Sequence, residues 1–223
     1  MIANDEIKKL WQIIAVGGRS ILELRALWPA GITPNHPPVT THFRVEDYSS
    51  VDGCKAAFEF EALRLNDRGF NIYIMMNPIK SSFSGSAAKD DDISYRDLLL
   101  IDIDRAEMKK EPATTAEVEA AGALAETVMA YLHHLSLGWS EPIRVMSGNG
   151  HHLYYILPGF PNDAEKKLEF KSLLKELAAK FDNETVKIDT AVFNASRITK
   201  VVGTIARKGI ESEGRPYRMA RVL

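Results

Sequence analysis

The feature that most constrains the fold is an apolar run that ends in two acids, LLLIDIDRA at residues 98–106. Consecutive apolar residues of this kind are typical of a central, buried strand. Asp102 and Asp104 stand two apart, so on a strand their side chains point to the same face. Adjacent like charges repel unless a cation lies between them, and carboxylate oxygens suit Mg²⁺ or Mn²⁺. The run predicts a buried strand with a candidate metal site, although an acid pair also occurs as a simple loop cap.

The second half of the chain predicts a regular alternation of strands and helices around this run. We expect a strand at 97–104, a helix at about 114–136 capped by Thr114 or Thr115 with Glu117, strands at 143–147 and 151–157, a break at Pro158, Gly159 and Pro161, a helix at about 162–181, and strands at 186–189 and 197–204. This order, βαββαβ, is a split βαβ unit with its helices on one sheet face. Its first and last strands can lie close together.

The first half predicts a mixture of helices, strands and loops. We expect a helix over 4–29 interrupted at Gly17–Gly18, a proline-rich loop at 30–40, a strand at 42–48, a helix at 51–66, a strand at 71–79 and a mobile polar surface loop at 80–94. The chain therefore belongs to the α+β class.

Composition excludes several classes of protein. Hydrophobic residues make up 45% and charged residues 26% of the 223 residues, which is ordinary for a globular protein. No apolar stretch approaches the roughly 20 residues that cross a bilayer, and the N-terminus lacks a signal-peptide pattern. Cys54 is the single cysteine, which excludes an internal disulfide and a multi-cysteine zinc ribbon. A reducing, cytoplasmic location is expected.

Charge is distributed unevenly along a chain whose formal net charge is only −2. Basic residues are dense near the C-terminus, at Arg197, Lys200, Arg207, Lys208, Arg215, Arg218 and Arg221. Such asymmetry permits a local phosphate-binding face on a near-neutral protein, and a solvated basic edge is the alternative.

A glycine-rich turn precedes a pair of histidines in SGNGHHLYYIL at 147–157. Gly148 and Gly150 can adopt positive φ and expose their N–H groups, and the side chains of Ser147 and Asn149 can donate to phosphate oxygens. His151 and His152 begin a strand, so only one of them faces the site. An ordinary hairpin turn is the alternative.

A third acid follows in KIDTAVFNASRITKVVGT at 187–204. Asp189 alone is typical of a loop cap, but the adjacency of the first and last strands would let it complete a metal site. Arg197 and Lys200 follow it, and a planar guanidinium suits phosphate recognition.

Together these segments resemble the motifs of the archaeo-eukaryotic primase superfamily, also called primase-polymerases. The first motif is matched by Asp102 and Asp104, the second by Ser147, Gly148, Gly150 and His152, and the third by Asp189. Residues 194–208 are similar to an extension in plasmid, phage and CRISPR-associated members, and NIYIMMNPI at 71–79 resembles an N-terminal-lobe strand. The chain lacks cysteines for the zinc element of many relatives, and Lys200 stands where relatives often have Arg.

The resemblance implies one catalytic domain, 1–223, with an N-terminal α/β lobe at 1–95 and an RRM-like βαββαβ palm at 96–223. It implies template-directed synthesis or extension of primers from nucleoside triphosphates on single-stranded DNA, with two Mg²⁺ or Mn²⁺ ions. The implied metal ligands are Asp102, Asp104 and Asp189; the implied nucleotide contacts are Ser147, Gly148, Asn149, Gly150, His152, Arg197 and Lys208; Lys200, Arg207 and Arg215 would contact nucleic acid.

Two other functions remain open at this level. One is a catalytically idle nucleic-acid-binding replication accessory on a primase-like fold, which a metal titration would distinguish. The other is a metal-dependent phosphodiesterase or sugar-nucleotide transferase, in which the SGNGHH turn has no obvious role. The chain ends in a strand-like YRMARVL, which favours a domain of a longer protein that includes a helicase or other domains.

Overall fold

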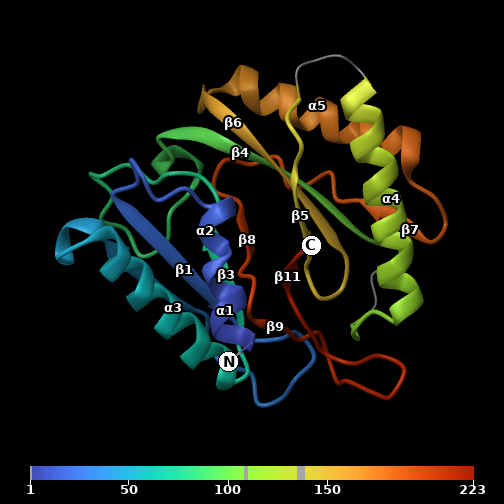
Figure 1. Cartoon of the computed structure of the whole chain (residues 1–223), viewed down its shortest axis with the longest axis horizontal. Helices are drawn as coiled ribbons and strands as arrows, with labels where there is room; N and C mark the ends of the chain where they lie inside the picture. The colour runs from blue at the N-terminus through green and yellow to red at the C-terminus, as the bar shows by residue number, and fades with distance from the viewer. Residues whose placement is uncertain (1, 108–109, 135–138) are drawn as a thin grey trace.

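Two antiparallel β-sheets organise the chain in the computed structural model, which describes residues 2–107, 110–134 and 139–223 (Figure 1). The first sheet has the strand order β2 (Val39–Arg44), β1 (Ile21–Leu27), β3 (Asn71–Met75) and β8 (Ile198–Lys200). The second has the order β11 (Arg221–Val222), β5 (Ile143–Met146), β6 (His151–Pro161), β4 (Tyr95–Arg105) and β7 (Val186–Ile188). A short pair, β9 (Ile205–Ala206) and β10 (Arg218–Met219), lies at their lower junction in Figure 1.

Helices cover the two sheets from outside. The helix α3 (Val51–Asp67) packs on β1 and β3, α4 (Thr115–His134) packs on β4 and β6, and α5 (Ala164–Phe181) packs on β7. The short helices α1 (Ile2–Lys8) and α2 (Leu10–Ile13) contribute buried side chains to the main core, and two 3₁₀ turns, η1 (Val45–Asp47) and η2 (Asp90–Asp92), lie in loops. The predicted α+β class is confirmed.

The predicted βαββαβ order is also confirmed. β4, α4, β5, β6, α5 and β7 follow one another, and β4 pairs with both β6 and β7, so the first and last strands of the unit are neighbours. α4 begins with a capping box, in which the Glu117 N–H donates to Thr114 Oγ1 at 3.1 Å and the Thr114 N–H donates to Glu117 Oε2 at 2.8 Å. The expected end of this helix at 135–136 lies outside the described residues.

The prediction of a helix through residues 21–29 is wrong, because residues 21–27 form β1. Ile21, Leu22, Glu23 and Leu24 are all buried, and so is Ala26, so this strand lies inside the protein and its burial has no simple period. Gly18, with φ of +84°, ends the preceding turn. β1 then finds partners on both sides, β2 and β3, and those pairings outweigh the local helical spacing.

The predicted break at residues 158–161 is wrong too, because β6 continues to Pro161. Among the described residues, β5 pairs with residues 151–154 of β6, and beyond them β6 pairs with β4 alone. A proline there removes no ladder hydrogen bond on the open side. Gly159, with φ of +92°, lies in the same stretch, where the register with β4 shifts between Arg96 and Leu98.

The expected strand at 197–204 is shorter and belongs to the first sheet, where β8 pairs with β3. The segment at 80–94 contains no strand, as expected, but Phe83 and Ala88 are buried and Asp90 accepts hydrogen bonds from Ser196. It is therefore packed against the body of the protein. The division into lobes at residue 95 stays a prediction, because one cluster of buried side chains includes Ile74 of β3 and Leu99 of β4. Within the described part of the chain, no helix has both the length and the apolar character needed to span a bilayer.

Candidate active site

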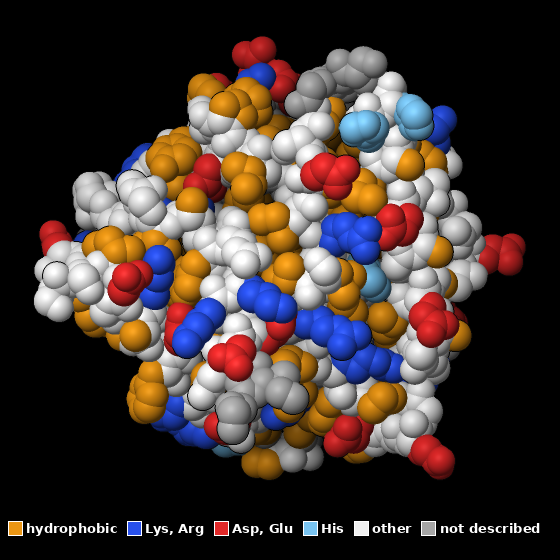
Figure 2. Space-filling model, in the orientation of Figure 1, with side chains coloured by type: hydrophobic (Ala, Val, Ile, Leu, Met, Phe, Trp, Pro, Cys, Tyr) orange, Lys and Arg blue, Asp and Glu red, His pale blue; other side chains and the backbone are white. Residues whose placement is uncertain are grey.

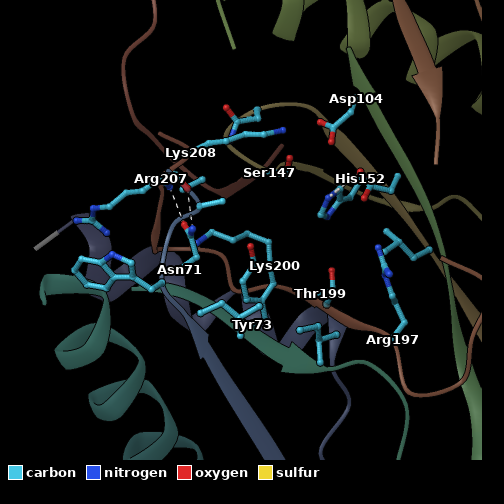
Figure 3. A pocket seen from close by; sticks show the side chains of 18 residues that line it. Asn71, Tyr73, Asp104, Ser147, His152, Arg197, Thr199, Lys200, Arg207 and Lys208 are labelled. Atoms are coloured by element: carbon cyan, nitrogen blue, oxygen red, sulfur yellow. Dashed lines mark hydrogen bonds and ion pairs between the residues drawn. The ribbon is translucent and has the colours of Figure 1, made fainter. Parts of the chain in front are cut away.

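Asp102 and Asp104 lie near the end of β4, on the face that lines a cavity of about 370 Å³ between the two sheets (Figure 3). Ile101 and Ile103 alternate with them and are fully buried on the opposite face. The predicted alternation therefore places both carboxylates at one cavity wall. The cavity is also lined by Leu27, Trp28, Ala30, Asn71, Tyr73, Leu100, Ser147, Asn149, His152, Arg197, Ile198, Thr199, Lys200, Ala206, Arg207 and Lys208.

The two acids have opposite electrostatic surroundings. Burial raises the pKa of Asp104 to about 6, and the neighbouring Asp102 carboxylate adds to the shift. Burial also opposes ionisation of Asp102, but His152, Arg197 and Lys208 outweigh it and hold that pKa below its ordinary value. The pair thus carries a stored repulsion that a cation would relieve.

The residues present fit a divalent cation. Asp102 Oδ1 is buried and accepts no hydrogen bond of normal geometry among the described residues, and His152 Nε2 lies 3.3 Å from it. Such an atom costs free energy unless a ligand satisfies it, and hard carboxylate oxygens are the donors that Mg²⁺ and Mn²⁺ prefer. Within the described ranges, no three His, Cys, Asp or Glu side chains converge as a ready ligand cluster.

Asp189 lies beside the acid pair, at the end of β7. Its backbone N–H donates to the Asp102 carbonyl at 2.8 Å, its Oδ1 accepts from the Ala191 N–H at 2.8 Å, and its Oδ2 lies 3.4 Å from Arg197 Nη2. The side chain borders a second hollow, which Asp104 also lines. The third acid is therefore near the first two, but its carboxylate is turned toward Arg197.

The glycine turn is built differently from the prediction. Gly148 has φ of +108°, as expected, but its N–H contacts Met146 Sδ at 3.0 Å, and the Gly150 N–H donates to Ser147 Oγ at 3.2 Å. The two N–H groups are therefore engaged within the turn rather than free for a phosphate. Side chains of Ser147 and Asn149 line the cavity, where Asn149 Oδ1 already accepts from the Ala113 N–H at 2.9 Å.

The histidines face opposite ways, as predicted. His152 lines the cavity, and its Nε2 lies 3.3 Å from Asp102 Oδ1. His151 lies under α4, where a Cβ on Gly122 would be 3.1 Å from its Nε2. Of these two histidines, His152 is therefore the one that can contact a molecule in the cavity.

Four basic side chains line the same cavity as the acids. Arg197, Lys200, Arg207 and Lys208 all line the cavity. Lys200 is 5% exposed, its Nζ donates to the Ile205 carbonyl at 3.1 Å, and burial together with Arg207 lowers its pKa to about 7. The Lys200 amine can therefore contact only a molecule that enters the cavity.

Arg215 does not line this cavity. Its guanidinium forms an ion pair with Glu117 at 2.8 Å and another with Glu111 at 3.2 Å, and it donates to the Pro112 carbonyl. Figure 2 shows a row of Lys and Arg side chains across the lower middle of the face viewed in Figure 1. The predicted nucleic-acid contact of Arg215 stays a prediction.

Sequence reasoning missed several residues that shape the cavity. Tyr73 lines it from β3, and burial raises its pKa to about 12. Asn71 binds the backbone of Arg207 twice, donating to its carbonyl and accepting from its N–H, both at 2.7 Å. Alternation along 71–75 could have placed Asn71 and Tyr73 on one face. The pairing of Asn71 with Arg207, 136 positions away, could not be found from a local pattern.

Two comparisons with known proteins found nothing: no protein-family model matches this chain, and no curated protein does. Solved structures do match. The primase-polymerase domain of cyanophage S-2L is 17% identical, with 98% of this chain and 88% of that chain covered and a TM-score of 0.52. Primase RepB′ is 12% identical, with 99% of this chain and 56% of that chain covered and a TM-score of 0.52. The polymerase domain of Mycobacterium tuberculosis ligase D, solved with DNA, is 16% identical, with 92% and 76% covered and a TM-score of 0.53.

At these identities the likeness establishes the fold. The chain has the α+β fold of archaeo-eukaryotic primase and primase-polymerase catalytic domains. The fold resemblance expected from the three sequence motifs is therefore confirmed.

Proposed function

We propose that this chain is a metal-dependent nucleotidyltransferase of the primase-polymerase type, which synthesises or extends primers on single-stranded DNA. The observation that carries the proposal is one cavity that is lined both by the acid pair, Asp102 and Asp104, and by four basic side chains, those of Arg197, Lys200, Arg207 and Lys208. Phosphoryl transfer requires acids that bind divalent metal ions together with basic side chains that bind phosphates, and this cavity has both. The fold supports this reading, because the similar structures are named as primases or polymerases and one was solved with DNA.

Asp102 and Asp104, together with Asp189 once it is released from Arg197, would hold two Mg²⁺ or Mn²⁺ ions. Bound ions would favour ionisation of the primer 3′-hydroxyl and stabilise the negative charge of the triphosphate and pyrophosphate. The Asp189 backbone N–H, bonded to the Asp102 carbonyl, keeps the end of β7 against the end of β4. The three acids thus stay within one small region without a ligand.

The remaining residues bind the nucleotide in this proposal. Arg197 and Lys208 neutralise phosphate charge, and His152, Ser147 and Asn149 donate hydrogen bonds to phosphate oxygens. Gly148 and Gly150 shape the turn that presents these side chains. Lys200 and Arg207 act inside the cavity, and the template follows the basic surface that includes Arg215, held mainly through its phosphates.

The proposal extends to the context of the chain. Residues 1–223 form one catalytic domain, with single-stranded DNA template, primer and nucleoside triphosphates as partners. A cytoplasmic location, without membrane association, and a helicase or further domains in a longer protein complete the proposal.

A primer-extension and de novo priming assay tests it, with ribo- and deoxynucleotides and with Mg²⁺ or Mn²⁺. Asp102→Asn and Asp104→Asn should each abolish nucleotide incorporation while the unfolding temperature stays the same or rises. Asp52→Asn is the matched control, because that carboxylate is 89% exposed on α3. Wild-type protein that binds DNA but incorporates no nucleotide with either metal would instead indicate a nucleic-acid-binding accessory module.

A further inference from the structure

Three side chains form a hydrogen-bonded chain from the cavity into the junction between the two sheets. His152 Nδ1 lies 2.8 Å from the hydroxyl of Tyr154, and this hydroxyl lies 2.5 Å from Thr199 Oγ1. His152 and Tyr154 belong to β6, whereas Thr199 belongs to β8 of the other sheet. Their exposed fractions are only 6%, 0% and 2%. These hydrogen bonds therefore join the two sheets next to Asp102, from which His152 Nε2 is 3.3 Å away.

The available hydrogens restrict how this chain is ordered. The Tyr154 hydroxyl has one hydrogen and meets two partners, so it donates to one of them and accepts from the other. When it accepts from Thr199 it donates to His152 Nδ1, and the neutral ring then carries its hydrogen on Nε2. The reverse order in a neutral ring would leave a lone pair on Nε2, 3.3 Å from Asp102 Oδ1, which is repulsive. The geometry therefore favours an Nε2–H that faces the carboxylate and the cavity.

We propose that Tyr154 and Thr199 are positioning residues, which orient His152 so that its Nε2–H points into the cavity and donates to a ligand oxygen. This inference rests on the proposed function, in which that oxygen belongs to the incoming triphosphate. It adds that this donor is oriented by Tyr154, whose hydroxyl is in turn held by Thr199 of the other sheet. The docking of β8 beside β6 is then part of the nucleotide site rather than only part of the core.

A purely structural role for the two hydroxyls is the competing explanation. Buried hydroxyls need partners, and an unpaired one costs about 1–3 kcal/mol. Tyr154 and Thr199 would satisfy each other in that case whatever the histidine does. The protein offers a matched control in Tyr155. Its hydroxyl is buried without a hydrogen-bond partner among the described residues, and its side chain lies on the other face of β6.

The first experiment reads the His152 ring itself and needs no activity. Nitrogen-15 NMR of the full chain, with His152→Ala to assign the signals, should show Nδ1 as an acceptor and Nε2 as protonated. Tyr154→Phe, which removes only the hydroxyl, and Thr199→Val should shift the Nδ1 signal and mix the two tautomers. Thr199→Ser, which keeps the hydroxyl, and Tyr155→Phe should match the wild type. Unchanged ring signals in both Tyr154→Phe and Thr199→Val would overturn the proposal.

The second experiment measures the nucleotide KM at saturating primer and template. Tyr154→Phe should raise KM about fivefold or more, Thr199→Val should act in the same direction, and Thr199→Ser and Tyr155→Phe should leave it unchanged. In a His152→Ala background, removal of the Tyr154 hydroxyl should have no further effect, because there is no ring to orient. An equal effect in both backgrounds would show a structural role and overturn the proposal. Expected NMR shifts in a protein without polymerase activity would retain the positioning role and reject the proposed function.

Discussion

Gly150 lies so close to Asp104 that a Cβ at position 150 would be 2.3 Å from Asp104 Oδ1 and 2.2 Å from the Ile103 carbonyl oxygen. Real Cβ atoms do not approach other atoms so closely, so any side chain here must displace backbone of β4 or the carboxylate itself. The glycine is therefore required by the packing of the turn against the acid-bearing strand. Its φ is not in the left-handed region, unlike that of Gly148.

Gly150→Ala should consequently move Asp104 and destabilise the fold together. Overpacking of this kind costs about 1–3 kcal/mol, and displacement of a reacting group by about 1 Å costs about 10²-fold in rate. Thermal unfolding and primer extension measure the two effects. Gly17→Ala is the control, because nothing lies within 4 Å of its added Cβ, and it should change neither quantity by much. A Gly150→Ala protein with wild-type stability would contradict the observed packing.

The acid pair predicts a pH dependence of stability in metal-free protein. The pKa of Asp104 is raised from 3.8 to about 6 by burial and by Asp102. Between those values the folded state binds more protons than the unfolded state, so stability should fall as pH rises from about 4 to 6. The pKa of Asp102 is below its ordinary value, so its titration affects stability only at pH values below this range. Asp104→Asn should flatten this dependence of stability on pH. It should also raise the unfolding temperature at pH 7, by about 2–4 °C for each kcal/mol gained in unfolding free energy.

Thermal unfolding across this pH range, with and without Mg²⁺, checks the prediction. Mg²⁺ should stabilise the wild type above pH 6, where both acids are ionised, and should stabilise Asp104→Asn much less. Parallel pH profiles for the wild type and Asp104→Asn would refute the coupling between the two carboxylates.

Lys200 predicts the opposite slope at higher pH. Burial, with Arg207 nearby, lowers its pKa from 10.5 to about 7. Between those values the unfolded state binds the extra proton, so stability should rise with pH from about 7 to 10. Lys200→Met should stabilise the protein at pH 6–7, remove this slope and reduce nucleotide incorporation. Denaturant unfolding at several pH values measures this stability. Lys175→Met is the control, because Lys175 is exposed, and it should keep the wild-type dependence on pH.

The parts of the fold that sequence could predict are those with a clear local period. The strand carrying Asp102, the capped helix after Thr114 and the alternation of His151 and His152 all follow from side-chain spacing, and the structure confirms them. The βαββαβ order then brings Asp189 beside Asp102, as expected.

The failures involve partners distant in the chain. Residues 21–27 carry a spacing compatible with a helix, and only pairing with β2 and β3 decides for a strand. β8 follows β7 closely in sequence yet pairs with β3. The bond between Tyr154 and Thr199 depends on that pairing, so no local pattern could reveal it.

Arg197 offers a test that separates nucleotide binding from template binding. Its guanidinium lies 3.4 Å from Asp189 and lines the same cavity as Asp102, so we expect it to contact the triphosphate. Arg197→Ala should raise the nucleotide KM and lower kcat, because the charge to be neutralised grows as pyrophosphate leaves. Template affinity should change little.

The contrast appears in template-binding isotherms recorded at several salt concentrations without nucleotide. A residue that binds template phosphate contributes about one unit to the salt slope, and its loss should reduce that slope accordingly. Arg64→Ala on α3, where the side chain pairs with Glu61, controls for general loss of charge. If Arg197→Ala lost template affinity and salt slope while keeping its nucleotide KM, Arg197 would bind the template, and Lys208 would be the basic side chain left to neutralise the triphosphate.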